Sequence, residues 1–295
     1  TLQCLKAVPE FNQSLQQFSA AQAQAPRAGD GNGMLTSQLG SLFRQMDNTL
    51  EPVTPFGFVQ VLRQVFAQFD EKNPKTGYHR QQDADELQNA VMTAVANAAR
   101  QADPGALLGP SAGQHGGGAT ANVEDALFGI EFSNTLKCLA CDAEPAVLKS
   151  ETARKLVCNI SRDVSHMYAG LKMNLEGNLE KMSGILGQTV PWSTTKRIKR
   201  LPRYICIQFN RFYWKQPDGP AMARDHPNGL PCKMVKAVSF PEKLDMFDFC
   251  DDSLQALLKP VREAFAVKYV FKTKTMLRIV SHCLGFRIGN GENND

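Results

Sequence analysis

The chain has 295 residues, 43% of them hydrophobic, and a formal net charge of only +4. This length and composition fit a globular protein with one large domain or two small ones. No apolar run approaches the roughly 18 residues that cross a bilayer, and the N-terminus does not resemble a secretory signal, so we expect no membrane association and a location in the cytoplasm or the nucleus.

The first hundred residues have the apolar spacing of helices. In the first of them, Pro9 is acceptable as part of an initial turn. A loop is expected over residues 20–33, and residues 102–122, which contain six glycines, are predicted to be a flexible linker or a surface insertion. The predicted helices span 1–18, 35–46 and 59–69, and a fourth begins after Gln81 and runs to about residue 100.

From Phe128 onward, apolar residues alternate with polar ones, as they do in half-buried strands. The strongest strand signal covers residues 204–214. Residues 216–231 hold four prolines and are predicted to be a long irregular loop, whereas 252–265 return to helical spacing. The pattern predicts an α+β protein that is helical before about residue 125 and rich in strands after it.

Five polar side chains stand where the fourth helix begins, in the sequence Gln-Gln-Asp-Ala-Asp-Glu-Leu of residues 81–87. Asp83 or Gln82 can accept hydrogen bonds from the free N–H groups at the start of a helix, so an N-terminal cap is one interpretation. A cap needs one acceptor and gives no reason for Gln81 and Glu86 to be polar as well. Contact with another molecule is the second interpretation.

This stretch resembles the Gln-Gln-Asp box of the ubiquitin-specific proteases, papain-like cysteine enzymes that cut ubiquitin from its conjugates. Three further stretches resemble family segments in the same order, at residues 1–5, 201–212 and 240–246. The likeness is strongest to the proteasome-associated member of the family and runs to about residue 265. It implies a deubiquitinating thiol protease whose partners are ubiquitin, ubiquitinated proteins and the proteasome, with no cofactor.

The resemblance also implies a fold and its divisions. The expected fold is an incomplete papain-like protease of the ubiquitin-specific type over residues 1–265. Its helical thumb would be residues 1–125, and its β-rich fingers and palm would be residues 126–265. Residues 266–295 would be a divergent tail of unknown role.

In the family, residues of the Gln-Gln-Asp box line a channel that holds the basic, extended C-terminal tail of ubiquitin. Gln81, Gln82, Asp83 and Glu86 are the corresponding candidates here. Carboxylates and amides suit this role because they can pair with guanidinium and backbone N–H groups. Asp85 departs from the family's usual His, Asn or Gln.

We expect no catalytic residue within this chain. The family's nucleophilic cysteine precedes the position that matches Thr1, and Cys4 matches a non-catalytic cysteine. The family's Gly-His-Tyr segment has no counterpart, since His282 lacks the aromatic residue that follows. The chain by itself is therefore expected to be inactive, and a non-catalytic ubiquitin-binding module or pseudoenzyme is the alternative to a fragment of an active enzyme.

Two further stretches have partial signatures of other site types. Cys138 and Cys141 have the spacing of half a zinc site, but a tetrahedral site needs four ligands and Cys158 stands alone, so we expect no bound metal and eight reduced thiols. Basic residues gather over 196–203 beside Trp192. Because no nucleic-acid-binding signature accompanies them, we expect a solvated charged edge and no nucleic-acid partner.

Overall fold

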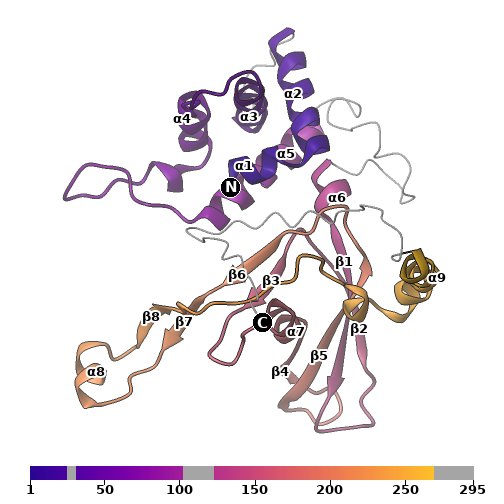
Figure 1. Ribbon diagram of the computed structural model, residues 1–295. Helices are drawn as coiled ribbons and strands as arrows, with labels where there is room; N and C mark the ends of the chain where they lie inside the picture. The colour runs from indigo at the N-terminus through magenta and orange to yellow at the C-terminus, as the bar shows by residue number, and fades with distance from the viewer. Residues whose placement is uncertain (25–30, 102–122, 269–295) are drawn as a thin grey trace, which may run out of the picture. The chain divides into compact units, whose positions relative to one another are not determined.

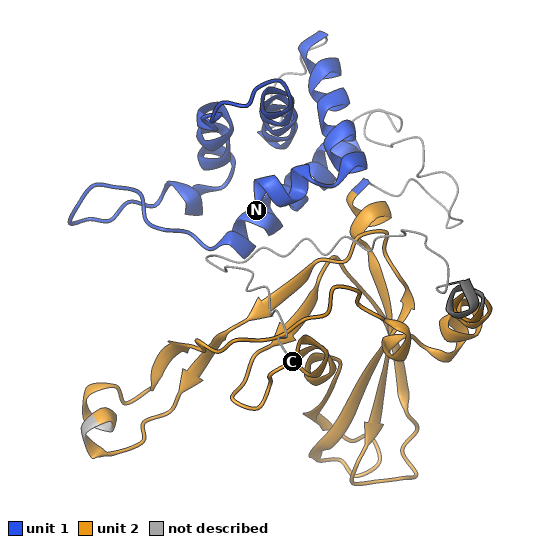
Figure 2. Cartoon of the chain, in the orientation of Figure 1, with its two compact units in different colours: residues 1–123, 280–295 blue, residues 124–279 orange. Residues whose placement is uncertain are grey.

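The computed structural model describes residues 1–24, 31–101 and 123–268. The chain divides into two compact units, of which the first contains residues 1–123 and the second begins at Glu124 (Figure 2). This division lies close to residue 125, where helical spacing gives way to alternation. The expected linker at 102–122 and nearly all of the expected tail lie outside the described residues.

The first unit is helical (Figure 1). Helix α3 packs against α2, α4 and α5, and apolar side chains such as Phe11, Leu15, Leu39, Phe43 and Val95 are buried at these contacts. The elements are α1 (Leu2–Lys6), α2 (Pro9–Gln24), α3 (Gly31–Asp47), α4 (Phe56–Val65), the 3₁₀ turn η1 (Ala67–Asp70) and α5 (Ala84–Gln101).

The prediction of one helix over residues 1–18 is wrong, because the structure has two. Pro9 has no N–H to donate to the carbonyl of Leu5, four residues earlier. That carbonyl instead accepts from the backbone N–H of Val8 at 3.1 Å, and the chain turns there before α2 begins. The expected loop over 20–33 is shorter than predicted, since α2 continues to Gln24 and α3 begins at Gly31.

The second unit is built on a four-stranded antiparallel sheet in the order β2-β1-β5-β4, accompanied by two separate strand pairs. Strand β3 pairs in parallel with β6, and β7 pairs antiparallel with β8. Helix α7 packs on β3 and buries Met167, Leu171 and Leu175. The strands are β1 (Ile130–Cys138), β2 (Val147–Ala153), β3 (Leu156–Asn159), β4 (Glu176–Met182), β5 (Thr189–Arg200), β6 (Ile207–Asn210), β7 (Phe212–Lys215) and β8 (Leu230–Lys233).

The other elements of this unit are α6 (Val123–Phe128), α7 (Met167–Leu175), α8 (Pro220–Asp225), η3 (Phe247–Phe249) and α9 (Asp252–Lys268). The predicted strand 204–214 is in fact two strands separated at Arg211. The guanidinium of Arg211 donates to the backbone carbonyl of Met234 at 3.3 Å, so this residue anchors the chain where it changes strand partners. In the part of the chain that the structure describes, no helix could span a membrane.

Three basic residues of β5, Lys196, Arg197 and Arg200, pair with carboxylates of the same sheet. Lys196 contacts the carboxylate of Glu151 at 2.7 Å, and Arg197 contacts Glu176 at 2.7 Å. The hydroxyl of Thr194 and the amide of Asn134 extend the first of these contacts into a network on one face. Three of the basic groups that suggested a nucleic-acid surface therefore have acidic partners in their own sheet.

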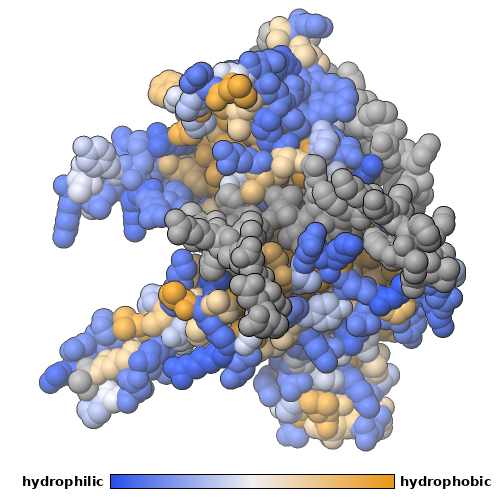
Figure 3. Space-filling model, viewed as in Figure 1, coloured by the Kyte–Doolittle hydropathy of each residue, from blue (hydrophilic) through white to orange (hydrophobic). Residues whose placement is uncertain are grey.

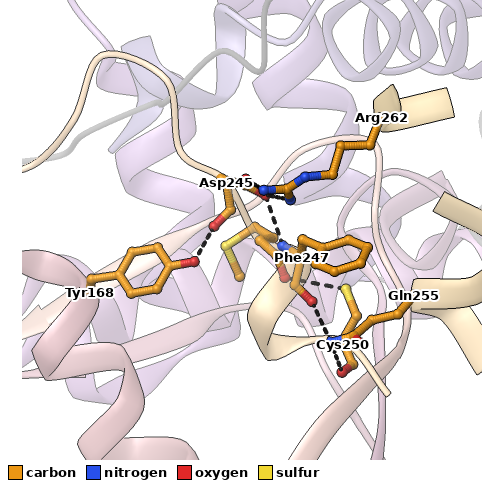
Figure 4. A network of polar contacts seen from close by, with 7 residues as sticks. Tyr168, Asp245, Phe247, Cys250, Gln255 and Arg262 are labelled. Atoms are coloured by element: carbon orange, nitrogen blue, oxygen red, sulfur yellow. Dashed lines mark hydrogen bonds and ion pairs between the residues drawn. The ribbon is translucent and has the colours of Figure 1, made fainter. Parts of the chain in front are cut away.

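Helix α9, which periodicity predicted over residues 252–265, is tied to the second unit by the network in Figure 4. The carboxylate of Asp245 pairs with Arg262 at 2.7 Å, and the hydroxyl of Tyr168 donates to the Asp245 carbonyl at 2.6 Å. The side-chain amide of Gln255 donates to the Phe247 carbonyl at 3.0 Å. These contacts hold α9 beside β5, where Leu254 packs on the core.

The close approach of α2 and α3 gives a stability prediction. A Cβ atom added at Gly40 would lie 2.1 Å from the backbone carbonyl oxygen of Leu15, which cannot move independently of α2. We expect Gly40→Ala to lower the free energy of unfolding by about 2 kcal/mol, as overpacking does in other cores. Chemical denaturation of the variant measures this.

Gly57→Ala is the matched control in the same unit. Its Cβ would meet only the end of the flexible Gln38 side chain, at 2.8 Å, which can rotate away. Alanine is also the better helix former, so this variant should be neutral or slightly more stable. Equal effects of the two substitutions would show that the α2–α3 contact is not as tight as described.

Candidate functional site

A polar cleft of about 370 Å³ lies in the first unit, where η1, the segment that follows it and the start of α5 meet. Three of the four residues that the sequence singled out, Gln81, Gln82 and Glu86, line this cleft. Its remaining lining residues are Gln68, Glu71 and Arg80. The structure thus brings most of the sequence-predicted residues together and adds three that the sequence analysis missed.

The segment from Glu71 to Arg80 is a hairpin that brings its two ends to the cleft. The backbone N–H of Arg80 donates to the carbonyl of Glu71 at 2.9 Å, and that of Asn73 donates to Tyr78 at 2.8 Å. Gly77 turns the chain with a φ of +71°, a conformation that favours glycine. The hairpin therefore places Glu71 and Arg80 beside each other.

Asp83 is the N-terminal cap of α5. Its carboxylate accepts from the backbone N–H of Asp85 at 2.7 Å, and its carbonyl accepts from Leu87 at 3.1 Å. The structure thus shows Asp83 as a helix cap, which is one of the two interpretations of this residue. Asp83 is not among the residues that line the cleft, and its contact with ubiquitin stays a prediction.

Glu86 and Gln81 are not used by the fold. Glu86 is three residues after the cap, where a glutamate often accepts a bond from the backbone N–H of the capping residue. Here no hydrogen bond or ion pair involves the Glu86 or Gln81 side chain among the described residues, and both are exposed at the cleft. These groups are available to a ligand.

Gln82 has a structural role at the same place. Its side-chain amide donates to the backbone carbonyl of Gln68 at 2.8 Å, which ties the start of α5 to η1. The cleft thus has a fixed wall on this side. Its charged lining groups are two carboxylates, Glu71 and Glu86, and one guanidinium, Arg80, so the lining is net negative and suits a basic ligand.

Two buried thiols, those of Cys158 and Cys250, are unsuited to nucleophilic chemistry. Burial raises the pKa of Cys158 to about 11, and burial also raises that of Cys250 to about 11. Both are protonated near pH 7, whereas the thiolate is the nucleophile. They serve as core side chains beside α7 and η3.

The described histidines have contacts of a structural kind. His79 pairs with Asp70 at 3.0 Å, and the Nδ1 atom of His166 accepts from the backbone N–H of Tyr168 at the start of α7. His226 ends α8. His115 and His282 lie outside the described residues.

The Cys138–Cys141 pair lies where β1 ends, at the end of the four-stranded sheet that carries the β1–β2 and β4–β5 turns. Cys138 is buried against Trp192, whereas Cys158 belongs to the separate core beside α7. The Glu144 carboxylate bridges the two turns at this end, accepting from the Ser183 hydroxyl and from the backbone N–H of Gly184 at 2.7 Å. No cluster of three or more metal-ligating side chains occurs in the described ranges.

The Ser183 and Gly184 hydrogen bonds favour the ionised carboxylate, so the pKa of Glu144 is lowered, with the Ser183 bond the main cause. Around this bridge the surface is apolar, as the lower part of Figure 3 shows, and Leu139, Ile185 and Met182 are each more than half exposed.

Comparison with known proteins gives consistent matches. A family model described as ubiquitin carboxyl-terminal hydrolase matches residues 1–267. Ubiquitin carboxyl-terminal hydrolase 6 of Arabidopsis thaliana is 32% identical over 263 residues, which are 89% of this chain and 49% of that protein. Ubiquitin carboxyl-terminal hydrolase 14 of Caenorhabditis elegans is 27% identical over 282 residues, which are 93% of this chain and 50% of that protein. The chain thus spans about half the length of these relatives.

The fold also has a solved counterpart. The chain aligns with a chain of the SAGA Ubp8/Sgf11/Sus1/Sgf73 DUB module bound to ubiquitin aldehyde with a TM-score of 0.58 and 16% identity. The alignment covers 85% of this chain and 50% of the other. This likeness confirms the expected α+β, papain-like fold.

The Cys138–Cys141 pair generates a test of metal content. We expect purified protein to contain much less than one zinc per chain, because two thiolates supply half of the ligands of a structural site. Elemental analysis measures the zinc, and incubation with a chelator should leave the melting temperature unchanged. About one zinc per chain, lost in Cys141→Ser, would contradict this expectation.

Proposed function

Because the chain belongs to the ubiquitin carboxyl-terminal hydrolase family, we propose that it is the ubiquitin-binding part of a deubiquitinating thiol protease. In this proposal the cleft beside the start of α5 receives the extended C-terminal tail of ubiquitin. In the hydrolytic step a thiol attacks the bond that follows this tail. We assign that thiol to a longer protein of which this chain would be one part. The proteasome is the proposed partner of that protein, and the cytoplasm or nucleus its location.

The observation that carries this proposal is the Glu86 carboxylate, which lies at the cleft and has no partner among the residues that the structure describes. A capping box would have engaged it with the backbone N–H of Asp83, but no such bond is made among the described residues, where the Asp83 carboxylate accepts from the Asp85 N–H. A carboxylate can make a charge-assisted bond with a guanidinium group of the basic tail.

The carboxamides of the cleft suit the backbone of the same tail. An extended peptide has unpaired N–H and C=O groups along both edges, and a glutamine side chain can donate to one and accept from the other. The Gln81 side chain makes no such bond among the described residues, whereas the side-chain amide of Gln82 donates to the backbone carbonyl of Gln68. Gln81 is thus assigned to the tail backbone, and Gln82 to the wall that positions it.

A second candidate function is a ubiquitin-binding module without catalysis. The burial of two thiols, Cys158 and Cys250, in the core of the second unit agrees with it, because these two serve as packing side chains. A fluorogenic amide of the ubiquitin C-terminus separates the two functions. Turnover by the longer protein supports the protease, and ubiquitin binding without turnover supports the module.

The tail contact is tested by Glu86→Gln. This change keeps the size of the side chain and removes its charge, so we expect the dissociation constant for ubiquitin to rise about tenfold, the loss of roughly 1.5 kcal/mol of a charge-assisted bond. Fluorescence anisotropy with labelled ubiquitin measures the change. The melting temperature should stay the same, since the fold does not use this carboxylate.

One control variant and two variants of the helix cap accompany it. Glu51→Gln removes an exposed charge in the same unit away from the cleft and should leave binding unchanged. Asp83→Asn should preserve the cap, whereas Asp83→Ala should cost about 1 kcal/mol of stability. Unchanged binding in Glu86→Gln, or an equal loss in Glu51→Gln, would contradict the proposed site.

A further inference from the structure

The hairpin carries an ion pair on the edge of the cleft. The Nη1 atom of Arg80 lies 3.3 Å from the Oε2 atom of Glu71, and the two side chains are 62% and 56% exposed. Both residues line the cleft. A guanidinium of the protein itself is therefore held against one of the two carboxylates that make the cleft acidic.

This ion pair is not needed to close the hairpin. The backbone already does so, through the bond from Arg80 to Glu71 and the bridge between Lys72 and His79. The pairing of His79 with Asp70 adds a second side-chain contact at the same end. Removal of the Arg80 charge should therefore leave the fold intact.

Exchange of the Arg80–Glu71 ion pair for another ion pair also costs little free energy. Ion pairs between exposed side chains contribute about 0–1 kcal/mol, because water solvates both partners and two side chains lose freedom. A guanidinium from a ligand offers Glu71 the same bond geometry that Arg80 offers. Glu71 can thus change partner, while Arg80 turns toward water.

We propose that Arg80 and Glu71 determine the specificity of the cleft, with Arg80 occupying Glu71 until a guanidinium group of the ubiquitin tail displaces it. This inference rests on the proposed function of the same cleft. Glu71 then serves as a second carboxylate receptor beside Glu86. A peptide without a guanidinium gains nothing from Glu71, since it leaves the internal pair closed.

The proposal predicts opposite effects of two neutralising substitutions. Arg80→Gln removes a competitor and a like charge, so affinity for ubiquitin should rise about threefold, the size expected for one solvated charge a few ångströms away. Glu71→Gln removes the receptor, so affinity should fall about fivefold. Both variants should melt at the temperature of the unsubstituted protein.

Lys75→Gln is the matched control, because it removes one positive charge from the same hairpin at a residue that does not line the cleft. Affinity of this variant for ubiquitin should stay unchanged. Each variant is also titrated with ubiquitin whose tail arginines are replaced by glutamine. Against this second probe, Arg80→Gln and Glu71→Gln should bind as the unsubstituted protein does.

The outcomes separate this inference from the proposed function. If ubiquitin binding depends on the tail arginines but is the same in Arg80→Gln and Glu71→Gln, the role of the pair is overturned and the proposed cleft stands. If the unsubstituted protein binds both ubiquitin probes equally, or neither, the proposed function is overturned as well. If Lys75→Gln and Arg80→Gln raise the affinity for ubiquitin equally, the effect comes from the net charge of the hairpin. That result would also overturn the role of the pair.

Discussion

The hydrogen bond from the backbone N–H of Asp85 to the carboxylate of Asp83 fixes where α5 begins, and the cleft depends on it. With Asp83 engaged as the cap, Glu86 is free one turn along the helix. The bond from Gln82 to the Gln68 carbonyl then holds this helix start against η1.

The two units differ in how they use polar side chains. In the second unit Lys196 and Arg197 of β5 pair with carboxylates of the same sheet, and Asp245 pairs with Arg262. At the cleft of the first unit, Glu86 and Gln81 have no such partners within the described ranges. Unused polar groups gathered in a concave surface are what a polar ligand requires, so the contrast favours the cleft as the functional surface.

The sequence predicted the long periodic elements and failed where one residue changes the direction of the chain. Helices α5 and α9 were predicted because their apolar spacing is uninterrupted. Pro9 was placed inside one helix although it separates two, and Arg211 was placed inside one strand although it separates β6 from β7. Helix α7 was missed because it is short and buried within a region of strand-like alternation.

Only part of the candidate site can be predicted from the sequence, because some of its residues come together only through a turn of the chain. Gln81, Gln82 and Glu86 are neighbours in sequence, so a local motif sufficed to predict them. Glu71 and Arg80 meet only because a glycine with positive φ closes the hairpin between them. The Gly77 turn was the one signal that could have indicated this pairing. Whether Asp83 caps or binds could not be decided from residue type, because one carboxylate suits both tasks.

Hydrogen–deuterium exchange of the protein with and without ubiquitin tests the central claim most directly. The account predicts that ubiquitin slows exchange in residues 68–90, which contain the hairpin and the first turns of α5, because a tail in the cleft would cover their backbone. Protection confined to the second unit, with unchanged exchange over 68–90 at saturating ubiquitin, would contradict it.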